Sequence, residues 1–195
     1  MNIVVQRVFL LGLLLTVVMN CQGQDHYLRF DTAYVDITGT STLHDWTVKA
    51  SEIADYPLEI AIGEAQEISS FTFSVVVSSM DGGRGSAMNN KIHKALLSTE
   101  HPSVNYVQLS PLALGSEESL MSQTISSTLE IAGVSNQYDL DIKTERTGDQ
   151  LSISTVQPLL LSDFDIEPPS AMFGQIETGD EIKVKMTFRY TYHEN

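Results

Sequence analysis

Residues 181–193 read EIKVKMTFRYTYH, and apolar and polar side chains alternate along the whole stretch. Successive side chains of a β-strand point to opposite faces, so this alternation predicts a long strand with one buried and one solvated face. The stretch FTFSVVVSS at 71–79 follows the same rule. One buried face and one solvated face are typical of strands in an antiparallel sheet.

Weaker alternation of the same kind extends over most of the chain. Short connections at 132–136 and 146–150 contain glycine and polar residues and are typical of hairpins, which join antiparallel neighbours. The remaining strands are predicted near 27–38, 44–52, 57–66, 104–110, 122–132, 137–146 and 149–159. The sequence therefore predicts an all-β domain of eight or nine strands, built as a sandwich or as a closed barrel.

One segment has helical periodicity instead. It reads SAMNNKIHKALLSTEHP at 86–102, where Ser86 or Asn89 can cap a helix and Pro102 prevents its continuation. Its apolar residues at spacings of three and four are Met88, Ile92, Ala95 and Leu96. We expect one short helix at about 87–98, lying across an end or an edge of the sheet.

The first 23 residues have the layout of a secretory signal peptide. Arg7 is followed by an apolar run from Val8 to Met19, which is shorter than the roughly 20 residues of a membrane-spanning helix. We predict that residues 1–23 are removed, that residues 24–195 form a single domain, and that the protein is exported to the periplasm or secreted. The alternative is a lipoprotein anchored to a membrane through Cys21.

The sequence is strongly acidic, and its single cysteine rules out an internal disulfide. Removal of residues 1–23 takes away Arg7 and no acidic residue, so the net charge of −14 becomes −15. Such a charge argues against nucleic acid and an anionic membrane surface as partners. We expect contact with a membrane only if Cys21 is lipidated. Cys21 is the only cysteine, so the domain depends on its apolar core.

The single tryptophan stands in the sequence STLHDW at 41–46, beside a histidine and an aspartate. Neighbouring strand residues point to opposite faces, which opposes a catalytic pairing of His44 with Asp45. The favoured interpretation is a structural corner that leads into the next strand, and the alternative is the rim of a ligand pocket, to which Trp46 is well suited. A hydrolase that uses His44 is retained as a third hypothesis.

Other chemical signatures are lacking in the sequence. The histidines have no metal-ligand spacing, no calcium-binding loop occurs, and SMDGGRGSAMNN at 79–90 does not have the spacing of a phosphate-binding loop. We therefore predict no catalytic residue, no metal site and no cofactor, and we predict that the protein is not an enzyme.

The order of these motifs resembles the YceI-like family of polyisoprenoid-binding proteins. The resemblance is carried by GTSTLHDW (39–46), FTFSVVVSSMDGG (71–83), NNKIHKALLSTEHPSVNY (89–106), STLEIAGVSNQYDLDI (127–142) and SDFDIEPP (162–169). It implies an eight-stranded antiparallel lipocalin-like barrel with one short helix, exported and holding a long apolar chain. Known relatives bind isoprenoid quinones, polyprenyl chains or fatty amides without altering them. Head-group residues are not transferred, because this chain departs from the better-studied branch at His44-Asp45-Trp46 and at 88–90.

The leading hypothesis is thus an exported lipid-binding protein that holds an isoprenoid or similar chain for storage or transfer. The alternative is a filled barrel that acts as a protein-interaction module through loops such as 111–121 or 163–178. The residues predicted to contact the apolar ligand are Trp46, Phe71, Phe73, Val75, Val77, Tyr106, Leu129, Ile131, Leu140, Ile142, Ile153, Met186 and Phe188.

Overall fold

The computed structural model describes residues 26–63, 65–171 and 173–194. The predicted signal peptide and Cys21 lie outside the described residues. The strands are β1 (His26–Ser41), β2 (Trp46–Ala50), β3 (Ile53–Ala54), β4 (Glu59–Ile62), β5 (Glu67–Ile68), β6 (Thr72–Val76), β7 (Met80–Asp81), β8 (Ser103–Gln108), β9 (Leu112–Ala113), β10 (Ser119–Ile131), β11 (Val134–Thr147), β12 (Gln150–Leu160), β13 (Ser170–Ala171) and β14 (Ile176–Glu194). The helices are α1 (Ser86–Ala95) and two 3-10 turns, η1 (Val77–Ser79) and η2 (Leu161–Phe164).

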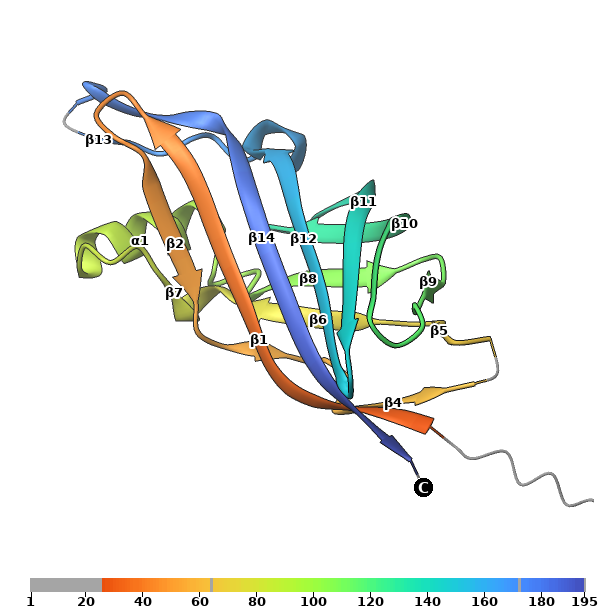
Figure 1. The fold of residues 1–195 in the computed structure, drawn as a ribbon. Coiled ribbons are helices and arrows are strands. Elements are labelled where there is room, and N and C mark those ends of the chain that lie inside the picture. Colours follow the sequence, from red (N-terminus) through yellow and green to blue (C-terminus); the bar gives the residue numbers. More distant parts are fainter. Residues whose placement is uncertain (1–25, 64, 172, 195) are drawn as a thin grey trace, which may run out of the picture.

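The architecture is a strongly curled antiparallel sheet with one α-helix. Long strands β1, β14 and β12 run side by side, β6 and β8 cross behind them, and α1 lies beside β2 and β7 (Figure 1). Pairing leads from β3 through β6, β8, β10, β11, β12, β14, β1 and β2 to β7. Strands β2 and β3 belong to the segment 46–54, and strands β6 and β7 belong to the segment 72–81. Because β2 pairs with β7 and β3 pairs with β6, these two segments pair with each other and contain both ends of the path.

The predicted count of eight strands is wrong, because the described residues form fourteen strand segments. Bends explain part of the difference. The strand expected at 44–52 is interrupted at Ser51 and Glu52, and the strand expected at 71–79 ends at Val76, where η1 begins. The short strands β5, β9 and β13 add pairings that the alternation of the sequence does not predict.

The sheet's core-facing residues follow the alternation of the sequence. In β14 the inward positions are buried or partly buried, and Tyr190 is completely buried. The hairpin between β10 and β11 turns at Ala132 and Gly133, which both have positive φ, as two-residue hairpin turns require.

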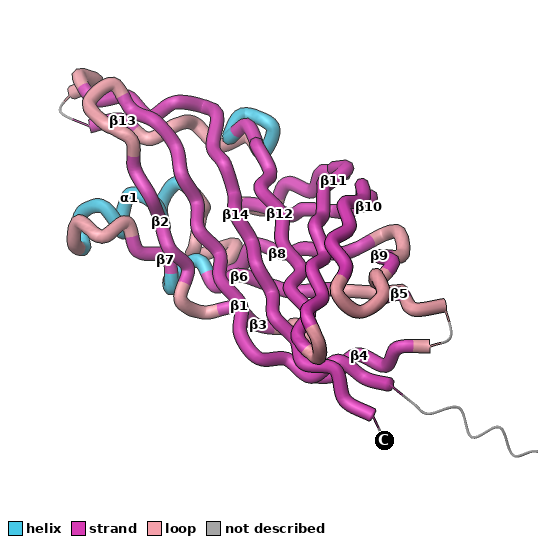
Figure 2. Tube along the Cα trace, viewed as in Figure 1, coloured by secondary structure: helices cyan, strands magenta, loops and turns pink. Residues whose placement is uncertain are grey.

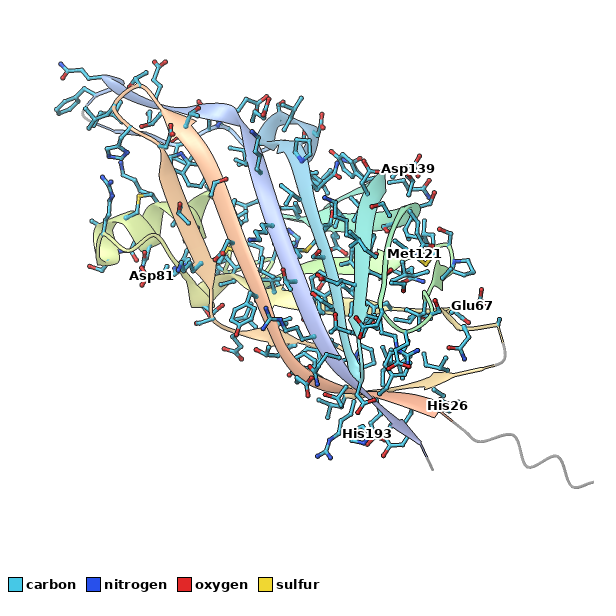
Figure 3. The ribbon with its side chains drawn as sticks, viewed as in Figure 1. His26, Glu67, Asp81, Met121, Asp139 and His193 are labelled. Atoms are coloured by element: carbon cyan, nitrogen blue, oxygen red, sulfur yellow. The ribbon has the colours of Figure 1, made fainter. Side chains whose placement is uncertain are left out.

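The helix ends at Ala95, three residues earlier than expected. It begins at Ser86 and has no side-chain cap, because the residue at the N-cap position is Gly85. Asn89 lies inside the helix, and its side chain accepts a hydrogen bond from the Gly82 N–H. Leu97 has a φ of 50°, which stops the helix well before Pro102. Asp81, just before this connection, lies at the edge of the structure near α1 (Figure 3), and its carboxylate accepts a hydrogen bond from the Gly83 N–H.

Candidate ligand-binding cavity

An apolar cavity of about 320 Å³ lies inside the curled sheet, beneath α1. Ligand pockets in proteins have volumes of roughly 300–1,000 Å³, so this cavity is at the small end of that range. Most of its wall comes from inward-facing aliphatic and aromatic residues of the sheet. The rest comes from α1 and from the segment that follows β12.

Eight of the thirteen predicted ligand-contacting residues line this cavity. They are Trp46, Phe73, Val75, Tyr106, Leu129, Ile131, Leu140 and Met186. Because side chains alternate along each strand, the same face that carries the hydrophobic residues in the sequence faces the cavity.

Four more of the predicted residues line a second, smaller space of about 30 Å³, namely Phe71, Ile142, Ile153 and Phe188. Phe73, Tyr106 and Met186 border both spaces and therefore form the partition between them. Val77 borders neither of them. It is buried, but the strand ends at Val76 and η1 begins at Val77, so the alternation that placed Val77 with Phe73 and Val75 no longer applies.

Aromatic rings fill the interior behind the partition. The ring centroids of Phe73 and Phe188 are 4.9 Å apart, and those of Phe71 and Phe188 are 5.1 Å apart. Phe30 and Tyr56 continue this cluster, with centroids 4.2 Å apart. One part of the interior is thus solid core and the other part is open.

Tyr106 and Gln108, which border the small space, both have hydrogen-bond partners. The Ser127 hydroxyl donates to the Tyr106 hydroxyl oxygen over 2.9 Å, and burial raises the pKa of Tyr106. The Gln108 amide donates to the carbonyl of Ile68 over 2.7 Å. These bonds fix the side chains that border the small space.

Residues of α1 and of the segment 161–176 complete the wall and were not predicted as ligand contacts. The sequence signal for the helix was present in its apolar spacing, which places one face against the sheet interior. The residues concerned are Met88, Ile92, Ala95, Leu96, Phe164, Ile166 and Ile176. The segment after β12 is held in place by Tyr138, whose hydroxyl donates to the Asp163 carboxylate over 2.7 Å.

The corner at 41–46 fits both main interpretations of its sequence, a structural turn and the rim of a pocket. The Ser41 hydroxyl donates to the carbonyl of His44 over 2.7 Å and also accepts from the N–H of His44, as in a tight turn. Ser41, Leu43, His44 and Trp46 also line the cavity. The corner is therefore both a structural turn and part of the cavity rim.

The His44 ring has contacts that differ from those of a catalytic triad. Its Nδ1 lies 3.0 Å from the backbone carbonyl of Asp45, and its Nε2 contacts the Arg84 guanidinium. The Ser41 hydroxyl contacts the backbone of His44 and not its ring. A nucleophile, base and orienting carboxylate in mutual contact are therefore not found at this corner.

The loop after β1 and the segment around β13 lie side by side (Figure 2). The Thr42 N–H donates to the carbonyl of Glu177 over 3.0 Å, and the Thr42 hydroxyl donates to the carbonyl of Gln175 over 3.2 Å. These bonds form one side of the cavity mouth. Across the mouth, Lys91 of α1 donates to the carbonyl of Ser170 over 3.0 Å.

The described residues contain no group of three or more His, Cys, Asp or Glu side chains placed to hold a metal ion. His26 and His193 lie at the end of the molecule away from α1 (Figure 3), and His193 stacks on Tyr27 with centroids 5.2 Å apart. None of the described helices has the length and apolar character needed to cross a membrane.

A curled antiparallel sheet around an apolar cavity is an architecture of ligand-binding proteins. No family model matches this sequence, and no curated protein matches it significantly. The fold is similar to that of a polyisoprenoid binding domain from Saccharophagus degradans implicated in plant cell wall breakdown. The TM-score is 0.64 at 14% identity, over 86% of this chain and 98% of that one.

Two further solved structures share the fold. BcnA of Burkholderia cenocepacia has a TM-score of 0.63 at 13% identity, over 80% of this chain and 95% of its own. The YceI protein of Campylobacter jejuni has a TM-score of 0.55 at 13% identity, over 76% of this chain and 84% of its own. The resemblance to the YceI-like family that the order of motifs predicts is therefore confirmed at the level of the fold.

Proposed function

We propose that this protein binds a long apolar molecule, an isoprenoid or a similar chain, in the cavity beneath α1 and shields it from water. The observation that carries the proposal is the wall of the cavity, which is built almost wholly from aliphatic and aromatic side chains. Each buried CH₂ group of a ligand contributes about 0.8 kcal/mol to binding, so such a wall favours a chain over a compact polar molecule.

The solved structures support the apolar class of ligand. One of them is described as a polyisoprenoid binding domain, and it shares the fold of this chain. Binding without chemical change agrees with the contacts of His44, which are with a backbone carbonyl and a guanidinium. Storage or transfer of the chain outside the cytoplasm is the role we propose, on the basis of the signal-peptide layout of residues 1–23.

The test is native mass spectrometry of the full chain purified from the compartment to which it is exported, followed by solvent extraction and identification of released molecules. We expect one apolar molecule per protein. In the Phe73→Glu variant, a carboxylate would be placed on the wall, and the bound molecule should be lost. A folded Phe73→Glu protein that retains its full load would refute binding in this cavity, as would a wild type that stays empty with polyprenols, quinones and fatty amides.

A second candidate function is recognition of a protein partner at the mouth. Leu43 is 66% exposed and Phe173 is fully exposed, and both belong to the segments joined through Thr42. Exposed apolar side chains grouped at one tip are typical of contact sites. Replacement of Phe173 by Ser should weaken capture of a partner under this function and leave the affinity for an apolar ligand unchanged, because Phe173 does not line the cavity.

A further inference from the structure

Methionine is concentrated in the wall of the apolar cavity. The described part of the chain contains four methionines, and three of them, Met80, Met88 and Met186, line the cavity. They come from β7, α1 and β14, so three separate elements each bring one thioether to the same space. The fourth, Met121, is on β10, away from α1 (Figure 3), and borders neither the cavity nor the small space. The thioether sulfur of the described residues is thus gathered where an apolar ligand would lie.

The three cavity methionines differ in their access to water. Met80 is 6% exposed and Met186 is 8% exposed, whereas Met88 is half-buried. Met88 is in the first turn of α1, and its side chain packs against Gly82 in the loop before the helix, where a Cβ on Gly82 would lie 2.7 Å from the Met88 Cγ. Met88 is therefore the cavity thioether that a small solute reaches most easily.

A thioether is a site of covalent modification by two-electron oxidants. A peroxide or a hypohalous acid transfers one oxygen atom to the sulfur of methionine. With hydrogen peroxide the O–O bond breaks and an S–O bond forms; the sulfur loses two electrons, and the peroxide is reduced to water, which carries away both hydrogens. The product is methionine sulfoxide, a polar side chain that methionine sulfoxide reductases convert back to the thioether.

A sulfoxide at Met88 would place a hydrogen-bond acceptor on the cavity wall. Water satisfies this oxygen while the cavity is empty, and an apolar chain in the cavity would remove that water. The N–H of Gly82, against which Met88 packs, is not free to replace it, because that N–H donates to the Asn89 side chain over 3.0 Å. The cost of desolvating the sulfoxide therefore falls on the ligand-bound state alone.

We propose that Met88 is an oxidation site that controls the loading of the cavity. A peroxide or a hypohalous acid converts the empty protein into a sulfoxide form that binds an apolar chain more weakly, whereas a bound chain covers the sulfur and protects it. Reduction of the sulfoxide restores binding, so the control is reversible. This inference rests on the proposed function and adds its regulation.

The first experiment measures where oxidation occurs. The full chain is treated with hydrogen peroxide, with and without farnesol, and each methionine is followed by peptide mass spectrometry. We expect sulfoxide to accumulate faster at Met88 than at Met80 and Met186, and we expect farnesol to slow the oxidation of Met88. Met121 is the internal control, because it is also half-buried but does not line the cavity, so farnesol should leave its rate unchanged.

The second experiment measures what oxidation does to binding. Equilibrium dialysis with farnesol gives the affinity of each protein before and after peroxide. The affinity of the wild type should fall by about tenfold or more, the usual cost of burying a polar group without a partner, and methionine sulfoxide reductases should restore it. Each variant is compared with itself. Peroxide should not change the affinity of Met88→Leu, and it should weaken binding by Met121→Leu as it does by the wild type.

Three results would overturn the inference and leave the proposed function intact. They are stoichiometric sulfoxide at Met88 with unchanged affinity, an equal loss of affinity in peroxide-treated Met88→Leu, and a rate of Met88 oxidation that bound farnesol does not change. An untreated wild type that binds neither farnesol nor hexadecanol would overturn the proposed function and this inference together.

Discussion

The ring of Phe73 stacks on the ring of Tyr106, with centroids 4.8 Å apart and an angle of 21° between the planes. The two residues are directly paired across β6 and β8. Both border the main cavity and the small space, so this stacked pair separates the two spaces and forms the floor of the cavity. The depth of the cavity, and with it the length of chain that fits, is therefore set by side chains and not by the backbone of the sheet.

Truncation of the floor should deepen the site. The Phe73→Ala variant would join the space of about 320 Å³ to the space of about 30 Å³ and add the volume of the lost ring. We expect longer chains to bind than in the wild type, and the free energy of unfolding to fall by about 3–5 kcal/mol. A series of saturated alcohols of increasing length, read by Trp46 fluorescence, measures the first effect, and urea unfolding measures the second.

The Phe73→Leu variant is the control for this change, since it keeps most of the side-chain volume and should shift the preferred length less. An unchanged length preference in Phe73→Ala would show that the floor lies elsewhere.

A methyl group on Gly39 should move the tryptophan. Gly39 is paired with Trp46 across β1 and β2, and a Cβ built at Gly39 would overlap the indole ring. We expect Gly39→Ala to displace the ring, to change its emission maximum and to weaken ligand binding. Gly63→Ala is the control, because a Cβ there meets nothing within 4 Å. Identical emission spectra for Gly39→Ala and wild type would contradict this placement of the ring.

Loss of the Ser127 hydroxyl should destabilise the fold. Ser127 and Tyr106 are both buried, and their hydroxyl groups share one hydrogen bond of 2.9 Å. Ser127→Ala leaves the buried Tyr106 hydroxyl without this partner, which should lower the free energy of unfolding by about 1–3 kcal/mol in urea titrations. Adding Tyr106→Phe should recover part of the loss, because both polar groups are then absent. A further loss of similar size in the double variant would argue that the two hydroxyl groups act independently.

The bond between Tyr138 and Asp163 should disappear at alkaline pH. Burial, the hydrogen bond to Asp163 and the charge of that carboxylate raise the pKa of Tyr138 to about 12 from its ordinary value of 10. The neutral phenol is favoured in the folded state, so the stabilisation is complete below about pH 10 and is lost as pH rises through about 12.

The measurement is the difference in free energy of unfolding between wild type and Tyr138→Phe across that range. We expect a constant difference below about pH 10 that closes toward about pH 12. A difference that widens with rising pH would contradict the direction of the pKa shift.

Replacement of His44 should change the rim of the cavity and should not abolish a catalytic activity. The ring contacts the carbonyl of Asp45 and the Arg84 guanidinium. We expect His44→Ala to remain folded, because Ser41 holds the corner through backbone groups, and to retain any esterase activity found in the wild-type preparation. Loss of such activity in folded His44→Ala would revive the hydrolase hypothesis.

Much of the fold was predictable because side-chain alternation is a local signal. The pattern of 181–193 identified the inner face of β14, and the same pattern in 71–79 identified Phe73 and Val75 as wall residues. Val77 lines neither space, because the strand ends before it and η1 begins there, and the alternation of the sequence gives no sign of that change. The prediction of eight strands was wrong for a similar reason, since bends and two-residue strands leave no periodic signal in the sequence.

The sequence did not predict that the interior is divided into an open cavity and a filled aromatic core. Alternation predicts which side chains point inward, but it does not tell which of them touch. Phe71 and Phe188 are far apart in the chain and meet only because β6, β8 and β14 share one curled sheet. Whether a part of the interior is open or filled therefore depends on which strands pair. In this structure one part is an open cavity and another part is filled by aromatic rings.

Helix α1 has no fully buried residue, and its inward side chains face the cavity. A ligand in that cavity would supply the apolar contacts that a neighbouring element supplies to an ordinary helix. Occupancy and the local unfolding of α1 are then linked equilibria, and a bound ligand lowers the population of the open helix by a factor that grows with the ligand concentration over its dissociation constant. Amide hydrogen exchange of 86–95 would thus report how full the protein is.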